Sequence, residues 1–177
     1  MRSTKVASRY AKSLLEIAIE QNKIDSILGD MNFMLEANNQ TKDFENLISS
    51  PIVSTEKKIQ IFEIIFEQFE EVSMSFVKLI TNNRRESHLL AIAQSFSDQV
   101  KEFKGIVPIT ITSATALDGS TREKIVAKVQ ETVKGQLEIE EMIDESLIGG
   151  FVVRMGDMQI DASVSSQFNN LKQRLAR

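Results

Sequence analysis

The hydrophobic periodicity of this chain changes once, close to Gly105, and that change limits the folds it can adopt. In the first hundred residues apolar side chains recur every three or four positions, which predicts helices. From 106 to 112 apolar and polar residues alternate, which predicts a strand. The sequence therefore predicts an α+β protein with two domains, which cover 1–104 and 105–177.

The first domain is predicted to be a six-helix antiparallel bundle, because its helices are joined by short connections. Gly29 and Pro51 are the only strong helix breakers in it. The third helix is stopped by Ser50-Pro51, since a proline disfavours the helical conformation in the residue before it, and Ser54 suits the N-cap of the next. That fourth helix is apolar on nearly every side, so we expect it at the buried centre of the bundle. The predicted helices run over about 4–21, 24–35, 43–49, 54–69, 72–81 and 89–103.

The second domain is predicted to be a small α/β domain with a short mixed sheet and a C-terminal helix. Pro108 should confine the first strand to a sheet edge or to its own first half, because proline cannot donate to a sheet ladder. Ser120 and Glu123 form a capping box for the helix that follows. That helix has a buried face of Ile125, Val126, Val129 and Val133. The later strands are 137–143, 151–155 and 158–160, and the last helix carries Val164, Phe168, Leu171 and Leu175.

The residue types that catalysis and metal binding need are scarce in this chain. There is no cysteine and His88 is the only histidine, so a thiolate or histidine metal site cannot be assembled. Gly149-Gly150 leads into a strand and lacks the Lys-Ser or Lys-Thr pair of a phosphate loop. The acidic residues from Glu138 to Glu145 lack the spacing of a calcium loop and are typical of a solvated strand face. We expect no catalytic, cofactor-binding or metal-binding residue.

Charge and hydropathy limit the partners and the location. The net charge of −4 argues against nucleic acid as the main ligand, because phosphate binding needs a basic field. No apolar stretch approaches the length of a bilayer-spanning helix. The basic, partly apolar N-terminus has the periodicity of a surface helix rather than the pattern of a targeting peptide. We therefore expect a cytoplasmic protein whose membrane association is indirect.

The segment 137–163 carries several unrelated residue types in a fixed order. That order resembles the signature of the delta subunits of F-type ATP synthases, which are homologous to the mitochondrial oligomycin-sensitivity-conferring protein. Two weaker matches are Arg9-Tyr10-Ala11 and Asn82-Asn83-Arg84-Arg85. Ala162 stands where many members have glycine, so this position is expected to need no positive φ. The signature positions are Asp144, Gly149, Gly150, Arg154, Gly156, Asp157, Asp161 and Ser163.

The chemistry of these signature residues also predicts structural roles for them. Gly149-Gly150 allows the backbone to turn tightly into a strand with no Cβ in the way. Gly156-Asp157 is a two-residue hairpin turn that reverses the chain. Asp161, just before Ser163, is placed to cap the last helix and to favour its positive end. None of these roles requires contact with a substrate.

The resemblance implies a function that composition alone does not reveal. It implies a non-catalytic stator subunit, which holds the catalytic head against the torque of a rotating shaft. The helical domain would receive the N-terminal helix of an alpha subunit, and the C-terminal domain would meet the C-terminal region of the b-subunit stalk. Membrane contact would arise only through the complex, at the cytoplasmic face of the cell membrane.

Surplus apolar surface on two helices indicates where partners bind. The first and fifth helices each carry two neighbouring apolar stripes, whereas packing in a bundle buries one. The surplus either packs internally or forms a groove for a partner helix. The last helix docks either on its own sheet or on the stalk. The predicted contact residues are Ala7, Tyr10, Ala11, Leu14, Phe76, Val77, Ile80, Phe168 and Leu171.

Two other classes of function are alternatives at this point. A helical RNA-binding or adaptor protein would use Arg84-Arg85 and a basic line along the first helix. Salt titration discriminates this class, because phosphate binding weakens steeply with salt. A small enzyme is the more distant alternative, since the constellations described above are missing. The basic line consists of Arg2, Lys5, Arg9 and Lys12.

Overall fold

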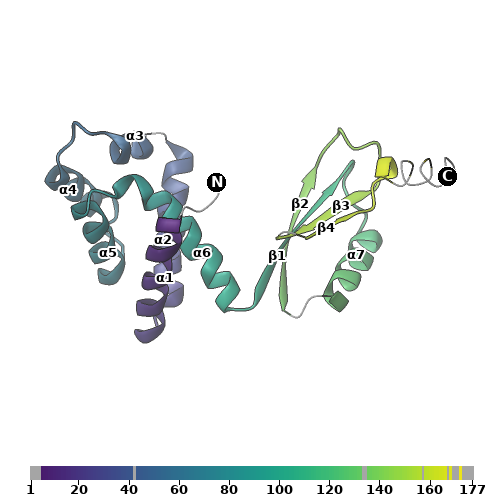
Figure 1. Ribbon diagram of the computed structural model, residues 1–177, viewed down its shortest axis with the longest axis horizontal. Helices are drawn as coiled ribbons and strands as arrows, with labels where there is room; N and C mark the ends of the chain where they lie inside the picture. Colours follow the sequence, from purple (N-terminus) through teal and green to yellow (C-terminus); the bar gives the residue numbers. More distant parts are fainter. Residues whose placement is uncertain are drawn as a thin grey trace. The chain divides into compact units, whose positions relative to one another are not determined.

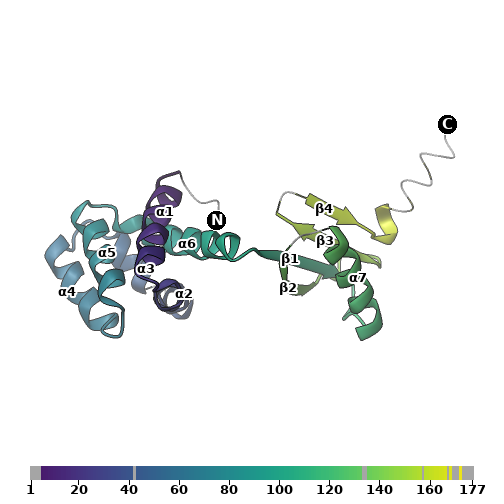
Figure 2. The same cartoon turned by 90° about the horizontal axis from the view of Figure 1, so that it is seen from below.

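The computed structural model describes residues 5–41, 43–132, 135–156, 158–166, 168 and 172. The chain divides into two compact units, Met1–Val100 and Lys101–Arg177. We call the first the helical unit and the second the sheet unit, after the elements that each contains (Figure 1, Figure 2).

Helices joined by short connections make up the helical unit. α3 spans Asp43–Ser49, as the sequence predicts, and Pro51 follows its end. α4 spans Thr55–Ile65, and the Ser54 hydroxyl before it accepts a hydrogen bond from the N–H of Lys57 at 3.4 Å, which confirms the predicted cap. The other elements are α1 Lys5–Glu20, α2 Ile24–Gln40, α5 Glu71–Asn82, the 3-10 turn η1 Glu86–His88 and α6 Leu89–Phe103.

Small residues on α1 and aromatic residues on other elements form the core of the helical unit. Ala7 and Ala11 are fully buried, so neighbouring helices can approach α1 closely. Phe66 stacks on Phe69 with ring centroids 4.3 Å apart, and Phe44 meets Phe66 edge-on at 5.6 Å. Aromatic pairs of these geometries add about 0.5–1.5 kcal/mol each beyond simple burial. The core therefore depends on shape as well as on apolar area.

α4 is not the buried centre of the helical unit, and the sequence prediction on this point is wrong. Within α4 only Lys58 and Phe62 are buried, whereas Ile64 is 77% exposed. One side of the helix packs against α5, and the apolar residues on the other side face solvent. An apolar side chain is often left exposed in folded proteins, so an all-round apolar helix does not by itself establish burial.

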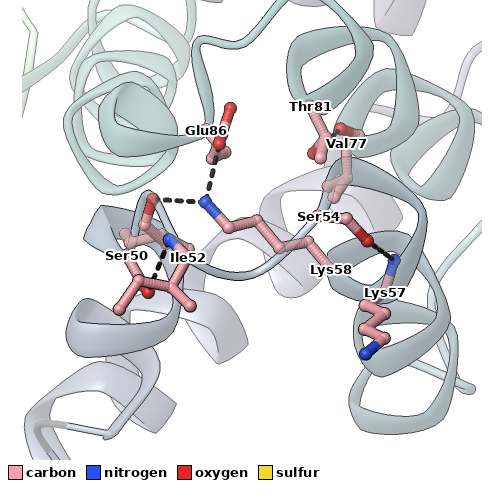
Figure 3. Close-up of polar contacts among 9 residues, drawn as sticks. Ser50, Ile52, Ser54, Lys57, Lys58, Val77, Thr81 and Glu86 are labelled. Atoms are coloured by element: carbon pink, nitrogen blue, oxygen red, sulfur yellow. Dashed lines mark hydrogen bonds and ion pairs between the residues drawn. The ribbon is translucent and has the colours of Figure 1, made fainter.

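A lysine forms part of the interior between α3, α4 and η1. Lys58 is 2% exposed, and its ammonium donates to the Glu86 carboxylate at 2.7 Å (Figure 3) and to the Ile48 carbonyl at 3.2 Å. The pair ties α4 to the turn η1 and to the end of α3. Because a buried charge is costly without its partner, the two side chains have to be present together.

The sheet unit contains a four-stranded mixed sheet in the order β2-β1-β3-β4 (Figure 1). The parallel pair β1–β2 needs a crossover connection, and α7, Gly119–Thr132, provides it. β3 pairs antiparallel with both β1 and β4. The predicted α+β class with a mixed sheet is therefore confirmed. The strands are β1 Ile106–Ser113, β2 Gln136–Ile143, β3 Phe151–Met155 and β4 Met158–Asp161.

One face of this sheet packs on α7. Ile109 and Ile111 of β1 form a buried cluster with Ile125 and Val129 of α7 and Val153 of β3. The predicted buried positions at Ile125 and Val129 are therefore confirmed; Val133 lies outside the described residues.

Pro108 lies in a central strand, so the edge alternative for the first strand is wrong. In register Pro108 lies opposite Glu138 of β2, whereas β3 pairs with β1 only from Thr110 onward. The first half of β1 therefore has one neighbouring strand at the position of the proline. The strand is not confined to its first half either, since β1 continues past the proline to Ser113.

The N-cap of α7 is Asp118, not the capping box predicted from Ser120 and Glu123. The Asp118 carboxylate accepts hydrogen bonds from the Thr121 N–H at 3.1 Å and from the Ser120 hydroxyl at 2.6 Å. These bonds, led by the one from Ser120, lower the pKa of Asp118 to about 2. The helix begins two residues earlier than the capping box indicated, at Gly119, and this shifts the capping position from Ser120 to Asp118.

Candidate partner-binding site

A groove between α1 and α5 is the main apolar concavity that the sequence analysis anticipated in the helical unit. It encloses about 520 Å³. Its wall on α5 follows one helical stripe, since Val72, Phe76 and Leu79 are separated by four and three residues. Its wall on α1 is formed in the same way by Leu14 and Ile17. We call it the α1–α5 groove, and its remaining lining residues are Gln21, Lys23, Glu71 and Ser75.

The α1–α5 groove has a buried floor and exposed apolar walls. Leu14 and Phe76 are buried, so they belong to the floor. Ile17 and Leu79 are 38% and 52% exposed, which leaves apolar surface on both walls in contact with water. Single exposed apolar side chains are ordinary, but a concave set of them framed by polar residues is typical of a docking site.

An ion pair fixes one end of the α1–α5 groove. The Lys23 ammonium donates to the Glu70 carboxylate at 2.7 Å, and the Glu70 N–H donates to the Asp30 carboxylate at 3.0 Å. The hydrogen bond from Lys23, followed by the charge of Glu70, raises the pKa of Lys23 above its usual value. The start of α5 is therefore held against the connection between α1 and α2.

The structure places the predicted contact residues of α1 and α5 in two groups. Leu14 and Phe76 line the α1–α5 groove. The other group packs in the helical core. Within it Ala7, Ala11, Val77 and Ile80 are fully buried, and Tyr10 packs half-buried against the core.

Three wall residues of the α1–α5 groove were not among the predicted contacts. Ile17 lies three residues after Leu14, and Leu79 lies three residues after Phe76. They belong to the apolar stripes that the sequence shows on these two helices, but they were left out of the predicted contacts. The signal was available, because both residues continue the i, i+3 spacing of a predicted contact. The three residues are Ile17, Val72 and Leu79.

The sheet unit exposes apolar residues at one edge of its sheet. Met158 and Ile160 of β4 are 57% and 46% exposed, although they share the face on which α7 packs. In the segment after β4, Phe168 is 56% exposed, with the Lys172 ammonium 4.8 Å from its ring centroid. Val164 is also exposed. Of the predicted contact residues here, Phe168 is described and Leu171 lies outside the described residues.

The glycine pair of the signature packs against the segment that follows β4. Gly150 has φ +81°, and a Cβ at this position would lie 2.4 Å from the Ala162 carbonyl oxygen. The Val164 N–H donates to the Gly149 carbonyl at 3.0 Å, and the Ala162 N–H donates to the Phe151 carbonyl at 3.0 Å. Among the described residues positive φ occurs outside glycine only at Asn22 and Arg84, so Ala162 needs none, as expected.

The carboxylates and hydroxyls of the signature fix the chain after β4. Asp161 accepts from the Ser163 N–H at 2.9 Å and from the Ser166 hydroxyl at 2.6 Å. These bonds, led by that of Ser166, lower the pKa of Asp161. The Ser163 hydroxyl accepts from the Ser166 N–H at 3.3 Å, so Ser163 supplies the cap while Asp161 orients it.

The remaining signature residues also have local partners or turn geometry. Asp144 accepts from the Ser146 N–H at 2.9 Å, and hydrogen bonds from Ser146 lower the pKa of Asp144. Arg154 donates to the Gln159 side chain at 3.3 Å across the β3–β4 hairpin. Gly156, with φ +52°, lies in the turn of that hairpin, and Asp157 lies outside the described residues. The described signature is therefore a set of turns and caps.

Two features are absent from the described part of the chain. No group of three or more histidine, cysteine, aspartate or glutamate residues there is arranged to hold a metal ion. Among the same residues, no helix combines the length and the apolar character that crossing a bilayer requires.

Two compact units, with an apolar groove on one and exposed apolar strand residues on the other, define a protein that binds other proteins. The family model described as ATP synthase delta (OSCP) subunit matches residues 6–175. The chain therefore belongs to the ATP synthase delta (OSCP) subunit family. It is a non-catalytic component of the peripheral stalk of an F-type ATP synthase, and this membership is favoured over the RNA-binding alternative.

Relatives and a solved structure agree with this assignment over nearly the whole chain. ATP synthase subunit delta of Flavobacterium psychrophilum is 33% identical over 176 residues, which cover 99% of each chain. That of Chlorobium chlorochromatii is 34% identical, with 98% of each chain covered. A chain in the mitochondrial ATP synthase hexamer of Toxoplasma gondii has the same fold, with a TM-score of 0.75 at 22% identity over 98% of this chain and 99% of that one.

Proposed function

We propose that this chain links the catalytic head of the ATP synthase to the b-subunit stalk and resists rotary torque. In this proposal the domain 1–104, a six-helix antiparallel bundle, holds the N-terminal helix of an alpha subunit. The domain 105–177 contacts the C-terminal region of the b-subunit stalk. The protein then lies at the cytoplasmic face of the cell membrane and reaches the membrane only through the complex. The observation that carries the proposal is the α1–α5 groove.

The shape of the α1–α5 groove favours a helix as its occupant. Its two walls are helices, and their apolar residues follow i, i+3 and i+4 spacings. An amphipathic helix presents anchors at the same spacings, so its apolar stripe can interdigitate with both walls. Burying the exposed parts of Ile17 and Leu79 contributes about 0.5–1.5 kcal/mol each, because full burial of such side chains is worth about 1.5–3 kcal/mol.

The exposed apolar residues of β4 and the following segment support a separate contact for the stalk. Met158, Ile160, Val164 and Phe168 all belong to the sheet unit, so this contact shares no residue with the α1–α5 groove. Two contacts on one chain reinforce each other. Once one is made, the other forms at an effective concentration of order millimolar for a short connection. The link can then hold under load although neither contact is tight.

The groove contact is tested by calorimetric titration of the full chain with a peptide from the N-terminus of its alpha subunit. Leu79→Asp places a charge on the apolar wall, so we expect affinity to fall at least about tenfold. Ile64→Asp is the matched control, since Ile64 is an exposed isoleucine on α4 that does not line the groove. Equal affinities of the wild-type and Leu79→Asp proteins would refute the groove assignment.

The stalk contact has its own test, which uses a peptide from the C-terminal region of the b-subunit stalk. Ile160→Asp and Phe168→Asp, made one at a time, should weaken binding of this stalk peptide and leave the alpha peptide unaffected. Leu79→Asp serves as the reciprocal control, because it should weaken only the alpha peptide. A variant of the sheet unit that weakens both peptides equally would contradict the division of labour between the units.

A further inference from the structure

A second concavity on the helical unit is formed by α2, α3, η1 and α6. It encloses about 510 Å³, within the range of about 300–1,000 Å³ that ligand pockets occupy. Among the described residues, none lines both this concavity and the α1–α5 groove. We call it the α2–α6 pocket.

The α2–α6 pocket joins an apolar surface to acidic side chains. Leu35, Ile48 and Leu90 supply apolar surface from three different elements. Glu45 and Asp98 add two carboxylates that are open to solvent. No lysine, arginine or histidine of the described residues lines the pocket. Its field therefore favours a cation.

Hydrogen-bond acceptors in the α2–α6 pocket are only partly satisfied. The side-chain oxygen of Asn38 is buried and has no hydrogen-bond partner. Asn38 also lines the pocket, so its side-chain amide reports on what binds there. The Gln94 side chain donates to the Asp98 carboxylate at 3.1 Å, which orients that carboxylate at the pocket.

We propose that the α2–α6 pocket binds a peptide segment of a partner protein that presents a lysine or arginine next to an apolar residue. The apolar residue packs on Leu35 and Leu90, and the cation lies near Glu45 and Asp98. A guanidinium or ammonium supplies several N–H donors, which suit these two carboxylates. The inference does not depend on the function proposed for the α1–α5 groove, because the two concavities have separate lining residues.

The test uses the full ¹⁵N-labelled chain and the blocked dipeptide acetyl-Leu-Arg-amide, followed by NMR. We expect saturable shifts of the Asn38 side-chain amide and of the Ala91 N–H. Acetyl-Leu-citrulline-amide has the same shape without the charge, so it should bind about three- to tenfold more weakly. Agmatine carries the guanidinium alone, and it should also bind more weakly because it lacks the neighbouring apolar residue.

Variants locate the binding in the α2–α6 pocket. Asp98→Asn and Glu45→Gln should each weaken the arginine dipeptide without changing the pocket volume. Glu16→Gln, an exposed acid on α1 outside the pocket, should leave its affinity unchanged. Ala91→Phe should fill the pocket and abolish the shifts, and the two carboxylate variants keep the test valid if Ala91→Phe does not fold.

Three results would overturn the proposal. These are the absence of saturable shifts in the wild-type chain, equal affinity for the arginine and citrulline dipeptides, and unchanged affinity in both carboxylate variants. Agmatine binding as tightly as the dipeptide would overturn the assignment to a peptide segment.

Discussion

The helical unit and the sheet unit are stabilised in different ways. Among the described residues, nineteen form the buried apolar cluster of the helical unit and six form that of the sheet unit, so the helical unit depends on packing. The sheet unit depends more on backbone geometry, through Gly150, the cap at Asp118 and the turn at Asp161. The residues of the family signature belong to these turns and caps of the sheet unit. Signature residues can therefore be structural even where they have no large side chain to pack.

The largest expected effect is a loss of core packing that destabilises the helical unit and leaves the sheet unit unchanged. Phe66→Ala should destabilise the helical unit by about 3–5 kcal/mol, because Phe66 is fully buried and contacts four other aromatic rings. Hydrogen exchange of the Val77 and Ile111 amides reports the two units separately. Val77 should exchange faster and Ile111 should not change. Phe103→Ala is the control, because Phe103 is 56% exposed. A similar loss of stability in Phe103→Ala would contradict the role assigned to core packing.

The next effect concerns the buried ion pair of the helical unit. Lys58→Met should cost roughly 3 kcal/mol, because it leaves the Glu86 carboxylate buried without its cation. The double variant Lys58→Met with Glu86→Leu should recover much of that loss, since it removes both charges. Denaturant unfolding measures both proteins. A double variant no more stable than the single one would show that the lysine acts mainly through its packing or its bond to Ile48.

Backbone geometry in the sheet unit gives the third prediction. Gly150→Ala should destabilise the sheet unit by about 2–3 kcal/mol, because alanine is strained at φ +81° and its Cβ would collide with the Ala162 carbonyl. Gly119→Ala is the matched control, since a Cβ at Gly119 meets open space. The exchange rate of the Ile111 amide measures the effect. Faster exchange of the Val77 amide, with no change at Ile111, would contradict the role of Gly150 in the stability of the sheet unit.

The smallest expected effect is a pH dependence of the cap of α7. The pKa of Asp118 is lowered to about 2 in the folded chain, from an ordinary value of 3.8. Its stabilising effect is therefore present above pH 4 and is lost as the pH falls through 2. The stability difference between the wild type and Asp118→Ala should shrink over that range. The stability difference between the wild type and Glu123→Gln should not vary with pH in this way. If it did, Glu123 would take part in capping α7, as the capping box predicts.

The sequence predicts most of the elements of both units but misplaces features that depend on tertiary packing. Helix ends that depend on local chemistry, such as Ser50-Pro51 and Ser54, agree with the structure because the cause lies within a few residues. The exposure of Ile64 was missed, since no periodicity says which side of an apolar helix has a neighbour.

The contact residues illustrate the same limit. Both walls of the α1–α5 groove lie on helices that the sequence identified as having surplus apolar surface. Which stripe of each helix is open depends on how α1 and α5 pack against the other helices, and that packing is not encoded in the spacing of one helix. Val77 was therefore predicted as a contact and is buried, while Leu79 was omitted and is exposed.

The most direct test of the connector account is an NMR titration of the full ¹⁵N-labelled chain with the alpha peptide and then with the stalk peptide. The account predicts that the first peptide shifts amides of α1 and α5 around Ile17 and Leu79, and that the second shifts amides around Ile160 and Phe168. Shifts from both peptides in the same unit, or no shift at the α1–α5 groove with the alpha peptide, would contradict it.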